Sequence, residues 1–368
     1  MDQSMPRYLQ LKQQLLQRIR SGDFQPGDRV PSEHQLARMA GVSRITAKQA
    51  LSELAREGWV YRVRGKGTFV SERPRPPERG PVQAIGVVVP YLRSAYSTGV
   101  VMGVESVLVE AGYHLVFRSA GTYREEEESV RSLSEAGVHG IIVWPAVGQF
   151  VNAEIVRLYL SRFPIVLIDR FYRGLPIDCA QSDNLRGGYL VTRHLLDLGH
   201  KHIAFVAGDE RLRNVTSVEE RHLGFQTALH ESGVAASDLL TWPAPDVPDW
   251  CEWLAAQLSE QPDVTALVAE NDEIALKLLV TLDELGVPVP GRISVTGFDD
   301  EDIAATAPVP LTTVRQDAVG LGKAAARLLL DRIEGRTPAT HRQQVILPVE
   351  LTVRESTDRP GTLPTLRP

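Results

Sequence analysis

The beginning of the chain has apolar residues at helical spacing. Tyr8, Leu11, Leu15 and Ile19 recur every three or four residues, which predicts an amphipathic helix that ends near Gly22. A turn-rich stretch, QPGDRVP, separates this pattern from the next one. The chain is therefore expected to open with a helix and a loop.

Two further helices are predicted after this loop. SEHQ begins at Ser32 with the form of a capping box, in which Gln35 can bond back to the Ser32 amide, and Gly41 is a typical helix end. Ser43 is expected to cap the following helix, which ends at Gly58. The buried stripe of that helix consists of Ala47, Ala50, Leu51 and Leu54. Two helices joined by a tight Gly-Val-Ser turn predict a helix-turn-helix, whose second helix fits the major groove of DNA.

The polar face of this second helix carries side chains suited to base and phosphate recognition. A guanidinium group suits guanine and a carboxamide suits adenine, so Arg44 and Gln49 are candidate base contacts. Thr46 and Lys48 could contact either a base or a phosphate. For one charged helix alone, a solvated face would be the better interpretation, so the next segment matters.

A β-hairpin pattern follows directly. In WVYRVRGKGTFV, alternating residues at strand spacing flank an RGKG turn. Arg64, Gly65 and Lys66 lie at the expected tip, where a wing would reach phosphates or the minor groove. Simple turn chemistry also explains the glycines and is compatible with a wing. The helices and the hairpin together predict a winged helix-turn-helix.

From Val82 onward, apolar strand patterns alternate with helical patterns. The strand patterns include AIGVVVP, HGIIVWP, PIVLID, KHIAFVAG and RISVTGFDD. This alternation predicts parallel sheets covered by helices on both faces. The segment exceeds the ~250 residues at which a single core stops growing, so two sheets are expected rather than one. The predicted fold class is α/β, with doubly wound parallel sheets after the winged module.

Polar and aromatic residues follow the predicted strands. Ligands bind at the carboxyl ends of strands in open α/β sheets, so these residues are candidate site residues. The candidates are Tyr91, Tyr96, Trp144, Asp169, Arg170, Asp183, Arg221, Asn271, Asp299 and Gln316. Carboxylates and amides can bridge adjacent hydroxyl groups, while aromatic faces cover the C–H side of a sugar. The set therefore predicts a sugar site.

Some nearby residues have simpler interpretations. Asp272 could serve only to cap its helix, and Asp300 is better explained as a turn or cap residue. His200 and His202 lie where a turn enters a strand, which favours a structural role over a metal pair. Arg221 lies in no obvious turn or cap motif and is, like Asp299, a strong candidate.

Charge is divided unevenly along the chain. Residues 1–80 hold 15 Lys or Arg against 8 Asp or Glu, and the remainder holds 25 against 38. A basic end on an acidic body is typical of a nucleic-acid-binding module attached to a larger domain.

Several classes of protein fit the sequence poorly. It lacks the GxGxxG, GxxxxGK[ST] and GxSxG motifs, so an enzyme that uses the aspartates as an acid/base pair is a remote alternative. Cys179 and Cys251 form no CxxC motif, the N-terminus has no signal-peptide pattern, and no run reaches the ~18 apolar residues of a membrane span. We therefore expect a cytoplasmic protein without a metal or cofactor, rather than a secreted sugar-binding protein.

The N-terminal motifs resemble a known family. P-S-E, G-V-S-R, A-L-x-x-L and G-x-G-T-F-V occur in order at the right spacing, and residues 5–71 resemble the winged helix-turn-helix of GntR-family transcription regulators. His34 and Lys48 stand where that family often has Arg, at positions that usually face DNA, so base preference is expected to differ. The complete set of expected DNA contacts is Ser32, His34, Ser43, Arg44, Thr46, Lys48, Gln49, Arg64, Gly65 and Lys66.

The larger part resembles a second family. VLIDR, DN-x-x-GG, R-x-x-GF-x-x-AL, ENDEIAL and ISVTGFDD together resemble the effector-binding domains of the LacI/GalR family, from about Ala84 to Arg354. The resemblance implies the two-lobed fold of periplasmic sugar-binding proteins, although PYLRSAYSTG departs from the usual Asn-Pro-Phe loop. It implies effector contacts at Asp169, Arg221, Asn271, Asp299 and Gln316, with an aromatic contact at Tyr96. A GntR-type head on such a body resembles the arabinose-responsive repressors of Gram-positive bacteria.

The expected organisation has four parts. They are a winged helix-turn-helix at 1–71, a linker at 72–82, an effector-binding and dimerisation domain at 83–357 and a flexible tail at 358–368. The expected function is that of a homodimeric repressor of sugar-utilisation genes, released from a palindromic operator by a small sugar, with a pentose such as arabinose favoured. A nucleoside, purine or sugar phosphate effector and a co-repressing effector are the alternatives.

Overall fold

The chain divides into two compact units, which are described separately. The computed structural model describes residues 6–71, 83–148, 151–208, 211, 214–235, 239–245, 249–338 and 342–361. The first unit, Met1–Val82, is called the head, and the second, Gln83–Pro368, is called the body. The predicted linker at 72–82 lies outside the described residues, as do residues 362–368 of the predicted tail.

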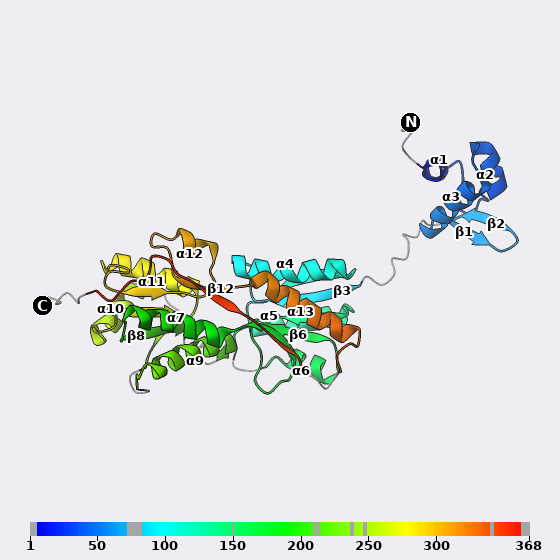
Figure 1. Ribbon diagram of the computed structural model, residues 1–368. Coiled ribbons are helices and arrows are strands. Elements are labelled where there is room, and N and C mark those ends of the chain that lie inside the picture. Colours follow the sequence, from blue (N-terminus) through cyan, green and yellow to red (C-terminus); the bar gives the residue numbers. More distant parts are fainter. Residues whose placement is uncertain are drawn as a thin grey trace. The chain divides into compact units, whose positions relative to one another are not determined.

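The head combines helices with an antiparallel hairpin (Figure 1). Its elements are α1 (Arg7–Arg20), α2 (Glu33–Ala40), α3 (Arg44–Arg56), β1 (Val60–Val63) and β2 (Gly67–Val70). One apolar core joins the helices and includes Leu11, Leu15, Leu36, Leu51 and Leu54. The predicted winged helix-turn-helix is confirmed.

The turn between α2 and α3 is held by side-chain caps. Gln35 donates its backbone N–H to Ser32 Oγ, and Gln35 Oε1 accepts the N–H of Ser32 at 2.8 Å, which completes the predicted capping box. Gly41 ends α2 at a φ of 62°, a left-handed conformation that glycine adopts without strain. Ser43 Oγ accepts the N–H of Thr46 at 3.1 Å, so the first turn of α3 is fixed.

Lobe 1 of the body contains a parallel sheet with the strand order β13-β7-β6-β5-β3-β4. The central strands are buried throughout, as expected when helices cover both faces. The strands are β3 (Ala84–Val89), β4 (His114–Ser119), β5 (Gly140–Val143), β6 (Ile165–Ile168), β7 (Asp178–Ser182) and β13 (Gln344–Leu347). The helices are α4 (Ala95–Glu110), α5 (Tyr123–Glu135), α6 (Ala153–Leu160) and α13 (Ala318–Ile333).

Lobe 2 contains a second parallel sheet with the order β11-β10-β8-β9. Its strands are β8 (Ile203–Gly208), β9 (Leu240–Ala244), β10 (Ala266–Ala269) and β11 (Ser294–Thr296). Its helices are α7 (Asn184–Leu198), α9 (Thr216–Glu231), α10 (Trp250–Glu260), α11 (Asp272–Glu284) and α12 (Asp302–Thr306). The two-sheet α/β prediction is confirmed.

The chain passes between the lobes at three places. It leaves lobe 1 between β7 and α7, returns between β12 (Thr313–Gln316) and α13, and leaves again between β13 and β14 (Val349–Thr352). β12 and β14 pair antiparallel beside the crossings. Three short connections at one side of a cleft form a hinge, about which two rigid lobes can close.

In each lobe one helix pair, α4 with α13 and α7 with α9, packs side by side (Figure 1), and each pair is in contact at glycines. In lobe 1, α4 and α13 approach so closely that a Cβ on Gly103 would lie 2.1 Å from the carbonyl oxygen of Val319. In lobe 2, a Cβ on Gly188 of α7 would lie 2.0 Å from the carbonyl oxygen of Arg221 in α9. No other residue fits at such a distance, so the glycines set the contact between the helices.

The end of the body is attached to lobe 2. The imidazole of His200 lies 2.8 Å from Thr265 Oγ1 through Nδ1 and 2.8 Å from the carbonyl oxygen of Asp358 through Nε2. Asp358 also donates its N–H to Ser294 Oγ at 3.2 Å. The body therefore includes residue 358, the first residue of the tail expected at 358–368. Among the described residues, no helix has the length and apolar character needed to cross a membrane.

Candidate functional site

The head presents its candidate DNA contacts at the start of α2, on α3 with the turn before it, and at the wing tip. Arg44 is the first residue of α3, and its side chain is 63% exposed, with Nε 3.6 Å from the carboxylate of Glu33. Nine of the ten expected contacts are exposed: Ser32, His34, Ser43, Arg44, Lys48, Gln49, Arg64, Gly65 and Lys66. Thr46 is half-buried, and its Oγ1 lies 2.8 Å from Ser43 Oγ, so these two hydroxyls also serve the helix cap.

The wing tip is the turn between β1 and β2. Arg64, Gly65 and Lys66 are exposed there, and Gly65 has a φ of 77°. At the start of β2, a Cβ on Gly67 would lie 2.7 Å from Nε of Arg29, so a larger residue would displace that arginine. The exposed basic groups can reach a phosphate backbone.

Sequence reasoning missed two residues on this surface. Ile45 in the first turn of α3 is 78% exposed, which suits an apolar contact with a thymine methyl group. Arg62 on β1 donates to Ser52 Oγ at 2.9 Å and lies 3.8 Å from Glu33. Ile45 could have been found from the sequence, because it is an apolar residue on the otherwise polar face of the predicted helix.

The body contains a cavity of about 550 Å³ between its lobes. Eight of the ten candidate residues line it: Tyr91, Tyr96, Trp144, Asp169 and Arg170 from lobe 1, and Arg221, Asn271 and Asp299 from lobe 2. They follow β3, β5, β6, β10 and β11 or lie on α4 and α9. The carboxyl ends of parallel strands from two sheets therefore face one cleft, as the strand-end rule requires.

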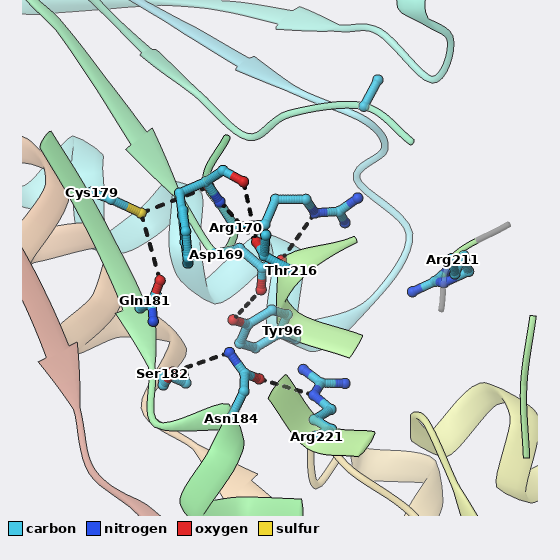
Figure 2. A network of polar contacts seen from close by, with 12 residues as sticks. Tyr96, Asp169, Arg170, Cys179, Gln181, Ser182, Asn184, Arg211, Thr216 and Arg221 are labelled. Atoms are coloured by element: carbon cyan, nitrogen blue, oxygen red, sulfur yellow. Dashed lines mark hydrogen bonds and ion pairs between the residues drawn. The ribbon is translucent and has the colours of Figure 1, made fainter. Parts of the chain in front are cut away.

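Tyr96 connects the aromatic and acidic parts of this cavity (Figure 2). Its hydroxyl lies 2.9 Å from Asp169 Oδ1 and 3.2 Å from Gln316 Oε1. Its ring stands edge-on to Trp144, with centroids 5.5 Å apart. The Trp144 indole Nε1 is buried without a hydrogen-bond partner among the described residues, so it can donate to a ligand.

Three of the four arginines that line the cavity are matched by carboxylates. Arg170 Nε lies 3.3 Å from Asp169 Oδ2, and both side chains are only 6% exposed. Arg211 Nε lies 2.9 Å from Oε1 of the buried Glu270. Arg221 Nη2 lies 3.6 Å from Asp299 Oδ1. Each of these three arginines therefore has a carboxylate partner when all six groups are ionised.

Arg221 is fixed by contacts on every side of its guanidinium group. Nε donates to Asn184 Oδ1 at 2.9 Å, and Nη1 donates to the carbonyl oxygen of Glu270 at 2.7 Å. The guanidinium carbon lies 3.7 Å from the centre of the Phe298 ring. The backbone of Arg221 is also the part of α9 that packs on Gly188. These contacts hold its orientation before any ligand arrives.

Burial raises the pKa values of acidic groups in this region. Burial raises the pKa of Asp299 well above its usual range, although the nearby Arg221 opposes the shift. Burial likewise raises the pKa of Glu270, and it raises the pKa of Asp272 to about 6. Burial and the neighbouring charge of Asp169 raise the pKa of Tyr96, so its hydroxyl stays protonated and can donate.

The two central aspartates also have unusual backbone conformations. Asp169 has a φ of 69° and Asp299 has a φ of 124°, both in the region that favours glycine. Strained residues of this kind cluster at functional sites, where the surrounding structure holds them. Their side chains are thereby turned from the strand ends toward the cavity.

Two candidate residues do not line the cavity, and the cap role considered for Asp272 belongs to its neighbour. Asp183 does not line the cavity, because it caps α7 and its Oδ1 accepts the N–H of Arg186 at 2.9 Å. Gln316 lies behind the wall, where its Nε2 donates to Asp299 Oδ1 at 2.6 Å. Asp272 does not cap α11, since the cap is Asn271, whose Oδ1 accepts the N–H of Ile274.

Other residues that were not among the ten candidates also line the cavity. They are Arg93, Ser94, Ala95, Arg211, Ser217, Asp272, Glu273, Leu276, Glu301, Asp302 and Ile303. Arg211 comes just after β8, so the strand-end rule that selected Asp169 would have found it. No sequence signal distinguished Glu301, which meets lobe 1 only in the folded body.

Comparisons with known proteins agree with this architecture. Residues 7–70 match the family model described as bacterial regulatory proteins, gntR family, and residues 192–357 match a periplasmic binding protein-like domain. The chain is 36% identical to an arabinose metabolism transcriptional repressor of Geobacillus stearothermophilus, over 97% of this chain and 99% of the relative. This chain belongs to the same family of transcriptional repressors.

Further similarities support the two-part assignment of this repressor-family member. A second arabinose metabolism transcriptional repressor, from Halalkalibacterium halodurans, is 31% identical over 95% of this chain and 96% of the relative. A solved LacI family regulator from Enterococcus faecium with bound ribose is 29% identical, with a TM-score of 0.63 over 75% of this chain and 99% of that one. A complex of the regulator CelR with cellobiose is 26% identical, with a TM-score of 0.67 over 89% and 100%.

Proposed function

We propose that the body binds a neutral sugar, with a pentose such as arabinose favoured, and that binding releases the head from its operator. The observation that carries the effector class is the one-to-one pairing of Arg170, Arg211 and Arg221 with carboxylates, two of which are buried and one half-buried. A ligand with its own charge would disturb this balance in a buried place, whereas hydroxyl groups can donate and accept without doing so.

The rim of the cavity supports the same choice against a phosphorylated ligand. Glu273, Glu301 and Asp302 line it together with one exposed arginine, Arg93. A phosphate would meet an excess of negative charge there. Tyr96 and Trp144 supply the aromatic surface against which the C–H face of a sugar packs.

The names of the relatives support the choice of sugar. Two of them are named for arabinose metabolism, and two of the similar solved structures hold ribose and cellobiose. The pocket is assigned to binding without chemistry, in keeping with relatives that are regulators rather than enzymes.

The mechanism follows from the two lobes. A sugar that contacts Asp169 in lobe 1 and Arg221 in lobe 2 favours the closed body, because only closure allows both contacts. We propose that two bodies associate as a homodimer in the cytoplasm, so that two heads meet the halves of a palindromic operator. Closure then alters the spacing of the heads and lowers operator affinity.

The test measures the thermal unfolding midpoint of the full chain in the presence of one ligand at a time. The panel contains arabinose, ribose, xylose, galactose, cellobiose, arabinose 5-phosphate and a purine nucleoside. A ligand at 100 times its dissociation constant adds about 2.7 kcal/mol to the folded state, so a neutral sugar should raise the midpoint by a few degrees. The phosphate ester of the same sugar should raise it much less.

The sugar that raises the midpoint is then added to the protein on an operator selected from random DNA. Fluorescence anisotropy should show release, and tighter binding would mean co-repression instead. The neutral-sugar assignment fails if the phosphate ester or the nucleoside shifts the midpoint while no neutral sugar does.

A further inference from the structure

The N-terminus of α4 is only partly capped by its own sequence. Ser94 Oγ accepts the N–H of Ser97 at 3.1 Å, and Ser97 Oγ accepts the N–H of Ser94 at 3.2 Å. A helix leaves its first N–H groups without partners inside the helix, so the N–H groups of Ala95 and Tyr96 need another acceptor. Both lie at the edge of the cavity.

The missing acceptor comes from the other lobe. Glu301, the residue before α12 in lobe 2, accepts the N–H of Ala95 through Oε2 at 2.8 Å. It accepts the N–H of Tyr96 through Oε1 at 3.3 Å. A carboxylate is the favoured group at this position, because the helix dipole places partial positive charge there. One helix of lobe 1 is therefore capped across the cleft by lobe 2.

Glu301 is itself held firmly in lobe 2. Its N–H donates to Asp272 Oδ2 at 2.8 Å, and Asp272 Oδ1 accepts the hydroxyl of Thr313 at 2.5 Å. The segment leading to it includes Asp299 and Asp300, both with positive φ angles. Asp300 lies 2.8 Å from Arg315 and 2.6 Å from Arg354, so the loop cannot swing freely.

Tyr96 is fixed at both of its ends by this arrangement. Its N–H meets Glu301 of lobe 2, while its hydroxyl meets Asp169 of lobe 1 and Gln316 of the crossing strand β12. We infer that Glu301 is a positioning residue that couples effector occupancy to lobe closure, by completing the cap of α4 only when the lobes meet. This role in the response rests on the proposed function, whereas the cross-lobe cap itself does not.

The first test replaces Glu301 by glutamine in the full chain. Glu301→Gln preserves size but removes the charge and presents an amide N–H₂ to helix N–H donors, so closure should become less favourable. The sugar should bind about tenfold more weakly by isothermal titration calorimetry. Operator affinity without sugar should stay within twofold of wild type. The matched control is Glu105→Gln, which removes an exposed carboxylate further along α4.

A second variant removes the donor instead of the acceptor. Proline is favoured at the first helical position, and Ser94 is extended, as a residue before proline must be. Ala95→Pro should therefore leave α4 intact while deleting the N–H that meets Glu301, and it should weaken sugar binding several-fold. Ala95→Val adds bulk but keeps the N–H and is the control. The double variant with Glu301→Gln should lose less than the sum of the two single effects.

Hydrogen exchange tests the cap without any sugar. The lobes are expected to meet part of the time before a sugar binds, so the cap should partly protect the amides of Ala95 and Tyr96 in wild type, and these amides should exchange several-fold faster in Glu301→Gln. The amide of Ser97, which bonds inside lobe 1, should not change. Unchanged exchange at Ala95 and Tyr96 would overturn the inference whether or not a sugar binds. If exchange changes but sugar affinity does not, the coupling role is wrong. A wild type that binds no sugar would instead count against the proposed function.

Discussion

The head surface and the body cavity use the same pair of chemical groups in opposite ways. On the head, Arg44 is 63% exposed and lies 3.6 Å from Glu33. In the cavity, Arg221 is 6% exposed, lies 3.6 Å from Asp299 and makes two further hydrogen bonds. Both arginines lie at the same distance from their carboxylates, so the two ion pairs differ in burial and in the number of surrounding hydrogen bonds.

The difference in burial determines which partners each arginine can bind. An exposed ion pair contributes little and is screened by salt, so Arg44 can leave Glu33 for a base or a phosphate at small cost. A buried ion pair has lost its hydration, so removing one of its partners is strongly destabilising. The head therefore suits a polyanion that exchanges readily, and the cavity suits a neutral ligand that adds hydrogen bonds to a fixed frame.

Replacing Arg221 should have the largest effect, because it should lower stability and abolish the sugar response together. Arg221→Ala leaves the half-buried Asp299 without its cation and leaves the buried Asn184 Oδ1 without a donor. The free energy of unfolding in urea should fall by about 3–5 kcal/mol at neutral pH, and the sugar response should be lost. Adding Asp299→Asn should recover part of the stability but not the response. A loss below about 1 kcal/mol would show that the pair is not desolvated.

Replacing Arg44 should have a smaller effect, confined to DNA binding. Arg44→Ala should weaken operator binding by about 1–3 kcal/mol in anisotropy titrations, while the unfolding midpoint and sugar affinity stay near wild type. Arg56→Ala at the other end of α3 is the matched control, since Arg56 is exposed and pairs with Glu53. Equal effects of the two variants would indicate general electrostatic attraction instead of recognition by the first turn.

The pH dependence of stability should show the smallest effect. Burial raises the pKa of Asp272 to about 6, so the folded body binds a proton more tightly than the unfolded chain does. This contribution is fully present below the unfolded pKa of about 3.9 and is lost as the pH rises through 6. Between pH 7 and pH 5, wild type should gain about 1 kcal/mol relative to Asp272→Asn. Parallel stability curves for the two proteins would place Asp272 in contact with water.

Sequence patterns predicted the elements better than they predicted side-chain directions. The spacing of Leu11 and Leu15 and the capping box at Ser32 are local features, and both formed as expected. The strand-end rule selected the correct edge of each sheet but not which side chains turn into the cavity. Asp183 follows β7 but caps a helix, and Gln316 ends β12, outside both lobe sheets, and bonds to Asp299.

Long-range contacts explain what no local pattern could reveal. Arg211 and Glu270 meet because β8 and β10 are neighbours in the sheet, although they are far apart in the sequence. Glu301 and Ala95 meet only because two lobes fold toward each other. Such pairs depend on the assembled topology, whereas caps and amphipathic stripes depend on a few consecutive residues.

The crossing of α7 and α9 at Gly188 has a consequence for how ligand preference can change. The carbonyl of Arg221 is pressed against that glycine, so the arginine cannot shift without moving two helices. We expect lobe 1 to meet the same ligand with Tyr91, which lies in the connection after β3 and should tolerate replacement more readily than the buried Trp144. New ligand preferences should therefore be easiest to obtain by substitutions in the lobe 1 wall of the cavity, while Arg221 in lobe 2 is kept.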